Sequence, residues 1–391
     1  MTGTDKRPLI AHVIYRLAVG GLENGVVNLL NNLPRDGYRH ALISLTDITD
    51  FSARLTNPEV GMYALHKPEG QTWRIFPEIY RLLKALRPSI LHTRNLAALE
   101  TCVPAWAAGV PIRIHGEHGF LDLDHTKVSI KSRMLRRVYR PWVDHYVTVS
   151  SSLASFLQSG VGVPAARISQ IYNGVDTVRF APAGRGATDS PFNKDSHFVI
   201  GTVGRMQPVK DQVTLARAFV ELARIRPRAM ARARLVLVGD GPLRGQAQRI
   251  LDDAGLSEYA WLPGERSDIA PLLRDMSLFV LPSRGEGISN TVLEAMSSGL
   301  PVLATMVGGN AELVDDCVNG ALVQPGDPQQ MALRIAEYLD SPALLEDHGR
   351  AAREKVEARF SLARMMAAYD QLYRGMLAMR TDDLTNRREA A

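Results

Sequence analysis

Two glutamates stand at the ends of the segment Glu286-Gly-Ile-Ser-Asn-Thr-Val-Leu-Glu294. The apolar run 278–282 before it is typical of a buried strand, and a helix is predicted to begin near residue 290. The free N–H groups and positive dipole end of such a helix can bind an anion. The carboxylates would suit hydroxyl groups beside a bound phosphate, Glu286 towards a sugar and Glu294 towards a ribose. Taken singly, Glu286 could instead be a solvated loop residue and Glu294 a partner of the helix dipole.

Two cations follow the strand predicted over 198–203. Arg205 and Lys210 would emerge at the carboxyl end of this strand, before a helix predicted over 211–224. Fixed cations there can neutralise the charge that develops on a departing diphosphate, Arg through bidentate contacts and Lys as a compact charge. Either residue taken singly could be an ordinary surface cation. Because no Gly-Lys-Ser/Thr follows, the segment does not indicate ATP hydrolysis.

The first half of the chain carries weaker signals. Gly20 and Gly21 stand between a predicted strand and a predicted helix, where they resemble a phosphate loop or form a simple tight turn. His115 and His118 lie in His115-Gly-Glu-His-Gly119 at the end of another predicted strand. Either histidine could position a sugar, act as acid or base near neutral pH, or be a hydrogen-bonded loop residue.

Strand-like and helix-like patterns alternate along the whole chain, which favours parallel sheets with helices on both faces. Strands are predicted over 9–15, 40–46, 89–93, 112–116, 145–149, 198–203, 235–238, 278–282 and 301–304, and helices over 21–32, 73–86, 211–224 and 291–298. Two doubly wound domains are therefore expected. Ligands of open α/β sheets bind beyond the carboxyl ends of the strands, so one active site is expected in a cleft between facing domains.

The predicted boundaries follow turn-rich composition. The first domain covers residues 1–178, a linker rich in Gly, Pro, Ser and Asp covers 179–196, and the second domain covers 197–379. A terminal helix over 361–379 is assigned to the second domain, and the tail 380–391 is expected to be disordered.

Composition limits the class of protein. The 391 residues are 46% apolar and 22% charged, as in soluble globular proteins, and the two cysteines, Cys102 and Cys317, form neither a disulfide framework nor a metal cluster. Neither a signal peptide nor a bilayer-spanning run is recognisable, so a cytoplasmic protein is expected.

Charge divides unevenly between the halves. Residues 1–178 hold 20 Lys/Arg and 14 Asp/Glu, a net of +6, whereas the remainder holds 26 and 27, a net of −1. The first domain is therefore expected to face something anionic. A nucleic acid is disfavoured because its usual binding motifs are missing and few aromatic residues are interleaved with the basic ones.

A basic amphipathic segment, 125–143, is the main candidate for contact with an anionic membrane. Its cations are Lys127, Lys131, Arg133, Arg136, Arg137 and Arg140. Each basic residue close to such a surface contributes roughly 1 kcal/mol. A solvated helix whose apolar face packs on its own domain is an equal alternative.

These motifs together resemble the family-4 retaining glycosyltransferases of the GT-B fold over nearly the whole chain. The matching segments are Gly20-Gly21, Val147-Thr-Val-Ser150, Ile171-Tyr-Asn-Gly-Val-Asp176, Gly204-Arg205 with Lys210, Val238-Gly-Asp-Gly-Pro242, Glu286 with Glu294, Glu294-Ala-Met-Ser-Ser-Gly-Leu-Pro301 and Val307-Gly-Gly309. Details such as His115-Gly-Glu-His-Gly119 resemble one branch of this family, which is associated with exopolysaccharide loci of bacteria that carry the exosortase sorting system.

The resemblance implies an α/β GT-B fold and a role for each matching residue. Arg205 and Lys210 would hold the diphosphate, Glu294 the ribose and Glu286 the transferred sugar; His118 would approach the reacting carbon. The implied catalytic residues are His118, Arg205, Lys210 and Glu286. The implied donor-binding residues are Gly20, Gly21, Gly204, Arg266, Gly287, Ile288, Ser289, Asn290, Thr291 and Glu294. Two departures concern the sugar side: Ile288 replaces a common aromatic residue, and Asn310-Ala-Glu312 replaces a frequent Pro-Glu.

The implied activity is a retaining transfer without cofactor or metal, from a UDP- or GDP-linked sugar. The expected acceptor is a polyprenol-linked or growing exopolysaccharide at the cytoplasmic face of the plasma membrane, where the protein would be peripheral. A soluble enzyme acting on a small acceptor such as a sugar phosphate, and a non-catalytic nucleotide-sugar binding protein, are alternatives. A Rossmann oxidoreductase is disfavoured because no Gly-x-Gly-x-x-Gly opens a first βαβ unit.

Overall fold

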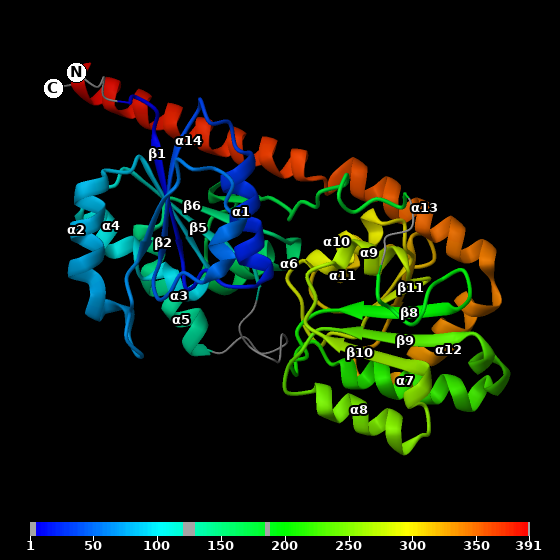
Figure 1. The fold of residues 1–391 in the computed structure, drawn as a ribbon. Helices are drawn as coiled ribbons and strands as arrows, with labels where there is room; N and C mark the ends of the chain where they lie inside the picture. The colour runs from blue at the N-terminus through cyan, green and yellow to red at the C-terminus, as the bar shows by residue number, and fades with distance from the viewer. Residues whose placement is uncertain (1–4, 120–129, 184–187, 390–391) are drawn as a thin grey trace. The chain divides into compact units, whose positions relative to one another are not determined.

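The computed structural model describes residues 5–119, 130–183 and 188–389, with side chains to residue 380. The chain forms two compact units (Figure 1). Unit 1 comprises the described parts of 1–119, 130–173 and 363–391, and unit 2 comprises those of 174–362. Each unit is built on one parallel sheet with helices on both faces, as the alternation of patterns predicted.

Unit 1 contains a seven-stranded parallel sheet in the order β3-β2-β1-β4-β5-β6-β7. Its strands are β1 (Leu9–Ile14), β2 (Arg39–Ser44), β3 (Gly61–Ala64), β4 (Ile90–Arg94), β5 (Ile112–Glu117), β6 (His145–Thr148) and β7 (Ile168–Gln170). Its helices are α1 (Gly21–Asn32), α2 (Phe76–Leu86), α3 (Asn95–Leu99), α4 (Cys102–Ala107), α5 (Ile130–Tyr139), α6 (Ser151–Ser155) and α14 (Leu362–Glu389). Strand order reverses between β1 and β4, which makes their carboxyl ends the natural binding edge.

The two faces of this sheet differ in chemistry because successive strand residues point to opposite sides. Ala11, Val13 and Leu91 face an apolar core that includes residues of α2 and α4. The alternate residues His12, His40 and His92 are buried on the other side, beside the aromatic residues of α14.

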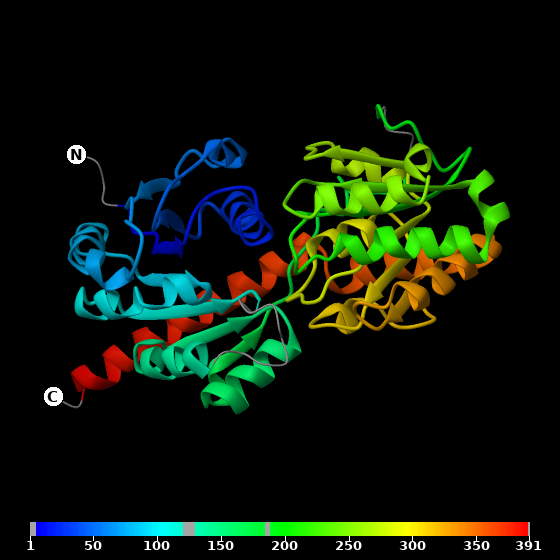
Figure 2. The same cartoon turned by 90° about the horizontal axis from the view of Figure 1, so that it is seen from below.

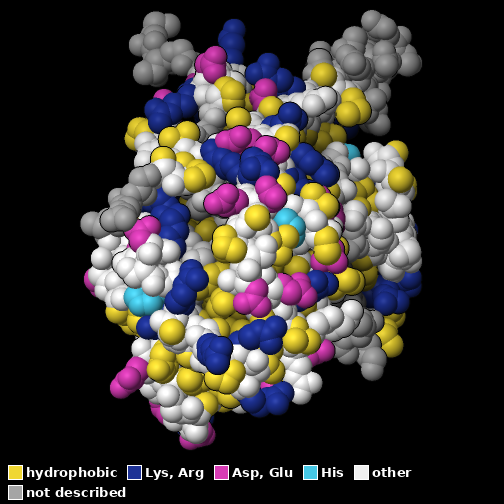
Figure 3. Space-filling view, turned by 90° about the vertical axis from the view of Figure 1, so that its right-hand side faces the viewer, with side chains coloured by type: hydrophobic (Ala, Val, Ile, Leu, Met, Phe, Trp, Pro, Cys, Tyr) yellow, Lys and Arg dark blue, Asp and Glu magenta, His cyan; other side chains and the backbone are white. Residues whose placement is uncertain are grey.

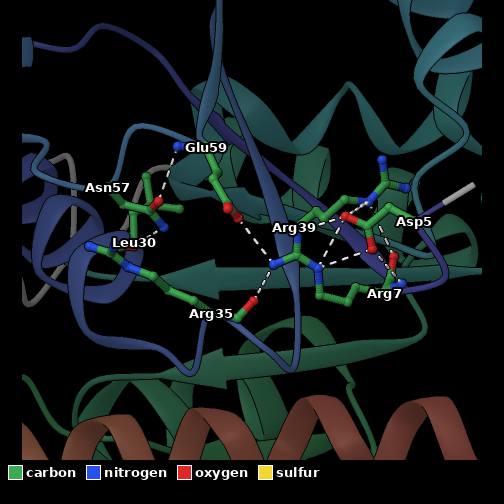
Figure 4. Close-up of polar contacts among 7 residues, drawn as sticks. All are labelled: Asp5, Arg7, Leu30, Arg35, Arg39, Asn57 and Glu59. Carbon is green, nitrogen blue, oxygen red and sulfur yellow. Dashed lines mark hydrogen bonds and ion pairs between the residues drawn. The ribbon is translucent and has the colours of Figure 1, made fainter. Parts of the chain in front are cut away.

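Arg7 fixes the chain where it enters β1 (Figure 4). Its guanidinium lies 2.6 Å from Asp5 and 3.0 Å from Glu59, and it also donates to the backbone carbonyl of Arg35. These contacts join the start of β1 to the loops that precede β2 and β3.

Unit 2 contains a six-stranded parallel sheet in the order β10-β9-β8-β11-β12-β13. Its strands are β8 (Phe198–Val203), β9 (Ala233–Val238), β10 (Ala260–Gly264), β11 (Leu278–Leu281), β12 (Val302–Thr305) and β13 (Gly320–Val323). Its helices are α7 (Gln212–Ile225), α8 (Arg244–Asp253), α9 (Ile269–Arg274), α10 (Asn290–Ser297), α11 (Asn310–Leu313), α12 (Pro328–Asp340) and α13 (Pro342–Arg359). Helices α7, α8 and α12 cover one face, and α10 and α13 pack together on the other (Figure 1). The strand order reverses between β8 and β11.

The surface of unit 2 carries charges of both signs. On the face drawn in Figure 3, Lys and Arg side chains are interspersed with Asp and Glu. Such mixing is usual for a solvated surface and gives this face no strong field of one sign.

All nine predicted strands are present, but four strands were missed. These are β3, β7, β10 and β13, the two outermost strands of each sheet. Central parallel strands are buried on both sides and appear as continuous apolar runs, whereas the edge strands β3, β7 and β10 are mostly half-buried. Tyr63 in β3 and Trp261 in β10, for example, are only partly buried. The edge strand β13 is an exception, because it is largely buried.

The terminal helix belongs to unit 1, so its assignment to the second domain was wrong. In both views α14 runs along unit 1 (Figures 1 and 2), where Tyr38 donates to Asp370 at 2.8 Å and His92 bonds to Tyr373 at 2.7 Å. Helical periodicity indicates a helix but not which sheet it covers. The tail also differs from expectation, because α14 continues to Glu389.

The predicted linker is largely part of unit 2, which begins at residue 174. Phe180 accepts a hydrogen bond from Ser297 of α10, and Phe192 is buried with Arg234 5.5 Å from its ring. The linker prediction followed turn-forming composition, which does not reveal these two buried aromatic anchors. Among the described helices, none is long and apolar enough to cross a bilayer.

Candidate active site

Lys210 and Glu286 meet where the strand order of unit 2 reverses. Lys210 lies in the loop after β8, and Glu286 lies in the loop after β11, the neighbouring strand. The Lys210 Nζ is 2.6 Å from Glu286 Oε1. The sequence predicted both residues and their position at strand ends, and the structure places them in direct contact.

The loop after β8 has its shape because glycines let other backbone segments approach it. Gly239 has φ +131°, and a Cβ there would lie 2.1 Å from the carbonyl oxygen of Gly204. Gly241 has φ +148°, and a Cβ there would lie 2.6 Å from the oxygen of Met206. The Met206 N–H donates to Asp240 O at 2.8 Å. The Gly-Asp-Gly-Pro turn, one of the segments that match the family, therefore supports the Arg205–Lys210 loop.

The loop that carries Glu286 is supported in the same way. A Cβ on Gly308 would lie 1.8 Å from Glu286 O, and one on Gly309 would lie 2.1 Å from Gly287 O. The Gly309 N–H donates to Gly287 O at 3.0 Å. The Gly-Gly pair after β12 thus packs directly against Glu286-Gly287.

Ser283 orients the carboxylate of Glu286. Its hydroxyl is fully buried and donates to Glu286 Oε1 at 2.6 Å. Thr305, at the end of β12, donates in turn to the Ser283 carbonyl at 2.5 Å. One carboxylate oxygen of Glu286 therefore accepts hydrogen bonds from both the Lys210 ammonium and the Ser283 hydroxyl. Ser283 was not predicted as a site residue, although its place three residues before Glu286 was a usable signal.

Helix α10 presents its N-terminus beside this loop. Ser289 is the N-cap, and its hydroxyl accepts from the backbone N–H of Val292 at 3.4 Å. Ile288 is buried, whereas Asn290 and Thr291 are partly exposed in the first turn. Glu294 follows one turn later and is half-buried. The predicted strand–loop–helix arrangement is confirmed, and its helix begins at residue 290.

The two predicted arginines of unit 2 differ in environment. Arg205 is exposed, directly after the positive-φ residue Gly204. Arg266 instead binds two carboxylates of its own unit, lying 2.6 Å from Asp189 and 2.7 Å from Asp268. Its role in donor binding stays a prediction and would require exchange of these contacts.

In unit 1, His118 follows β5 and is held by Asn95. The backbone N–H of His118 donates to Asn95 Oδ1 at 2.9 Å, and Asn95, directly after β4, has φ +57°. The His118 Nε2 is buried without a hydrogen-bond partner in the described parts of the chain. Burial and then the nearby Arg94 lower the pKa of His118 to about 3. A neutral imidazole suits positioning of a substrate better than proton transfer.

His115 has a structural environment. It is fully buried, bonds to Thr93 at 2.8 Å and lies 3.3 Å from Glu117. Burial raises the pKa of Glu117, but Arg136 and His115 outweigh this and bring it to about 2. Arg136 is therefore a buried partner of Glu117, at 2.6 Å, and its prediction as a surface cation was wrong.

Gly20 and Gly21 mark the start of α1, as predicted. Gly20 is the N-cap, with an extended backbone, and a Cβ there would lie 2.1 Å from the Glu23 carboxylate. The site residues of unit 1 thus follow β1 and β5, which lie on either side of β4. Among the described side chains, no group of three or more His, Cys, Asp or Glu is placed to hold a metal ion.

The two Rossmann-like parallel sheets make up the GT-B fold, which solved glycosyltransferase structures share. The chain belongs to the family-4 glycosyltransferases. The family described as Glycosyltransferase Family 4 matches residues 19–179, and the one described as Glycosyl transferases group 1 matches residues 197–341.

Relatives agree with this assignment. The chain is 27% identical to the UDP-Gal:alpha-D-GlcNAc-diphosphoundecaprenol alpha-1,3-galactosyltransferase of Escherichia coli, over 96% of this chain and 99% of that protein. It is 31% identical to the lipopolysaccharide core biosynthesis mannosyltransferase LpcC of Rhizobium leguminosarum, over 64% of this chain and 72% of that protein. The fold is similar to that of Anabaena HepE in complex with UDP-glucose, with a TM-score of 0.78 and 21% identity, over 94% of this chain and 100% of that one. The narrower exosortase-associated branch stays a prediction.

Proposed function

We propose that this chain transfers a sugar from a nucleoside-diphosphate sugar to a lipid-linked saccharide at the cytoplasmic membrane face, with retention and without a metal ion. The contact between Lys210 and Glu286 at the reversal of strand order carries this proposal. In this contact Lys210, which would bind the diphosphate, lies beside Glu286, which would bind the sugar hydroxyls. Arg205 would supply a second cation and Glu294 would bind the ribose. His118, Gly20 and Gly21 of unit 1 stay predicted site residues.

The leaving diphosphate accumulates negative charge as the bond to the sugar breaks. Cations held in advance at that position stabilise the transition state more than the bound donor. Glu286 is engaged by Lys210 and Ser283 and is assigned to sugar binding rather than to nucleophilic attack. The family resemblance supports attack by the acceptor on the face from which the diphosphate leaves.

The named substrates of relatives support the substrate class. The galactosyltransferase of Escherichia coli is named for a diphosphoundecaprenol-linked acceptor, and the HepE structure contains UDP-glucose. A UDP-linked donor is therefore the first candidate, with a GDP-linked donor as the second.

The outer face of α5 supports a membrane contact. Ile130, Met134 and Val138 recur every four residues and are 81%, 62% and 55% exposed. Lys131 and Arg137 are also exposed, and residues 130–143 contain no acidic residue. Residues 125–129 of the predicted segment lie outside the described residues.

A second exposed face, on α2 and the turn before it, has similar chemistry. Trp73 and Tyr80 are exposed, with Arg74 6.0 Å and Lys84 5.8 Å from their respective rings. Indole and phenol rings beside cations suit the boundary between lipid headgroups and water.

The first test is a thermal-shift panel of UDP, GDP, ADP and their sugars, which should identify the donor class by one clear stabilisation. Transfer is then measured with that donor, using a polyprenol-diphosphate-linked sugar and a sugar phosphate as competing acceptors. Faster transfer to the lipid-linked acceptor is expected. A preference for the sugar phosphate would favour the soluble alternative, and nucleotide-sugar binding without any transfer would indicate a non-catalytic protein.

Three further measurements separate the parts of the proposal. The product formed from an α-linked donor should have the α configuration by NMR, and EDTA should leave the rate unchanged. Vesicles containing phosphatidylglycerol should bind the protein more tightly than neutral vesicles, and Met134→Ser with Arg137→Gln should weaken that binding. Leu333→Ser, an exposed site on α12, provides the matched control. An inverted product, a strict need for a divalent ion or an unaffected vesicle binding would each contradict one part.

A further inference from the structure

Arg284 binds the residues on both sides of Lys210. Its backbone N–H donates to the carbonyl of Val209 at 2.8 Å, and its Nε donates to Oδ2 of Asp211 at 2.8 Å. Arg284 also lies two residues before Glu286, the partner of Lys210. The loops after β8 and β11 are therefore joined by three contacts centred on one lysine.

Asp211 has a backbone conformation that favours glycine. Its φ and ψ are +48° and +41°, in the left-handed region, at the N-cap of α7. Glycine would adopt this conformation without strain, so the need for a turn does not explain an aspartate. The carboxylate explains it, because Oδ2 accepts both from Arg284 and from Thr214 Oγ1 at 2.8 Å.

The exposure of this ion pair indicates what it can contribute. The Asp211 side chain is buried, but that of Arg284 is mostly exposed. Ion pairs that open to water add little to the free energy of unfolding. The contact can still restrict the positions that the loop takes up, and lysine, on its flexible stem, depends on the backbone that carries it.

We propose that Asp211 and Arg284 are positioning residues, which hold the Lys210 ammonium against the Glu286 loop before the donor binds. The inference rests on the proposed function, in which Lys210 stabilises the departing diphosphate. Without the ion pair between Asp211 and Arg284, the loop that carries Lys210 would spend part of its time with the ammonium displaced from the diphosphate. The chemical step would then slow more than donor binding weakens, because catalysis is more sensitive to misplacement than binding is.

The test compares Asp211→Gly, Arg284→Gln and the double variant. Each single change should lower kcat about ten-fold, with the KM for the donor changed less than about two-fold. Asp211→Gly relieves backbone strain but also removes the acceptor of the buried Thr214 hydroxyl, so its Tm should fall, whereas the mostly exposed Arg284→Gln should leave Tm nearly unchanged. The double variant should be no slower than either single variant, since both break the same contact. Arg284→Lys keeps the backbone hydrogen bond and the charge and should recover most of kcat.

Asp315→Asn provides the matched control, because it removes a surface ion pair with Lys355, at 2.8 Å, from the same unit. Its kcat should be unchanged. The inference would be overturned by a double variant whose losses multiply, or by an Arg284→Gln variant whose kcat falls only together with Tm. Lys210→Ala is measured in parallel. If it is fully active, the proposed function fails; if it is inactive while Asp211→Gly and Arg284→Gln are normal, only the positioning role fails.

Discussion

Lys210 and Glu286 are in contact at 2.6 Å although they are 76 positions apart in the chain. Each group sits on a loop locked by close backbone approaches, at Gly239 for one and at Gly308 for the other. Charges fixed in this way need little rearrangement when the reaction begins, which is the condition for electrostatic stabilisation of a transition state. The pair also connects two neighbouring strands at the point where ligands of α/β sheets bind.

Removing either member of this pair should nearly abolish transfer. Lys210→Ala and Glu286→Ala are each expected to lower kcat/KM by roughly 10²–10³-fold, from lost transition-state stabilisation. The measurement is initial-rate kinetics with the donor found in the thermal-shift panel. Lys194→Ala, which changes an exposed lysine of unit 2, should be normal. Near-normal turnover of both site variants would refute the site assignment.

Ser283→Ala tests the support of Glu286. The hydroxyl is buried and donates to the carboxylate at 2.6 Å, and a hydrogen bond to a charged group contributes about 1.5–3 kcal/mol. Loss of this bond should lower kcat/KM at least about ten-fold, in proportion to that energy. Ser159→Ala removes a hydroxyl that donates only to the Ser155 carbonyl on the surface and serves as the control. Equal rates for the two variants would show that Ser283 does not position the carboxylate.

His118 should affect rate without setting a pH optimum. Burial and Arg94 hold its pKa near 3, so the imidazole is neutral throughout pH 5–8. His118→Gln should lower kcat/KM while leaving the shape of the pH–rate profile unchanged between these limits. If the variant loses an ionisation that the wild type shows near neutrality, His118 acts as an acid or base.

The histidines beneath α14 should make the protein less stable in acid. Burial, followed by Arg7 and Arg94, lowers the pKa of His40 from 6.5 to about 4, and burial also holds the pKa values of His12 and His92 well below 6.5. The unfolded chain therefore takes up protons below about pH 6.5 that the folded chain refuses. The free energy of unfolding therefore keeps its full value above that pH. It falls towards pH 4 by about 1.4 kcal/mol per pH unit for each histidine.

His40→Gln should reduce by one the number of protons that the chain takes up on unfolding below about pH 6.5. Urea unfolding between pH 4 and 7 gives the slope of the free energy of unfolding for wild type and variant. His66→Asn is the control, because His66 is exposed and asparagine tolerates its positive φ. An identical slope for His40→Gln and wild type would mean that His40 titrates alike in the folded and unfolded states, which would contradict the lowered pKa.

The nine predicted strands and the helices α1, α2, α7 and α10 followed from local patterns. Their residues are buried on one or both faces, so the apolar residues of the sequence recur with the period of the helix or strand or form a continuous run, as over 198–203. Three of the four edge strands could not be found in this way, because half-buried segments such as 61–64 have no sustained apolar run. The same limit applies to α14, whose pattern predicted a helix but not its docking on His92. The fourth edge strand, β13, is largely buried and was missed although its residues are apolar.

The chemistry of the site was largely written in the sequence, since residue type and position after a strand determine which groups reach the carboxyl edge of a parallel sheet. Arg205, Lys210, Glu286 and Glu294 were predicted on that basis. Only the tertiary structure decided which groups touch. It brings Lys210 into contact with Glu286 and Ser283 into contact with the same carboxylate. It also bonds Arg284 to the two residues that flank the lysine. The physical reason is that a local pattern records burial, whereas contacts between loops depend on strand order and on glycines that allow backbones to approach closely.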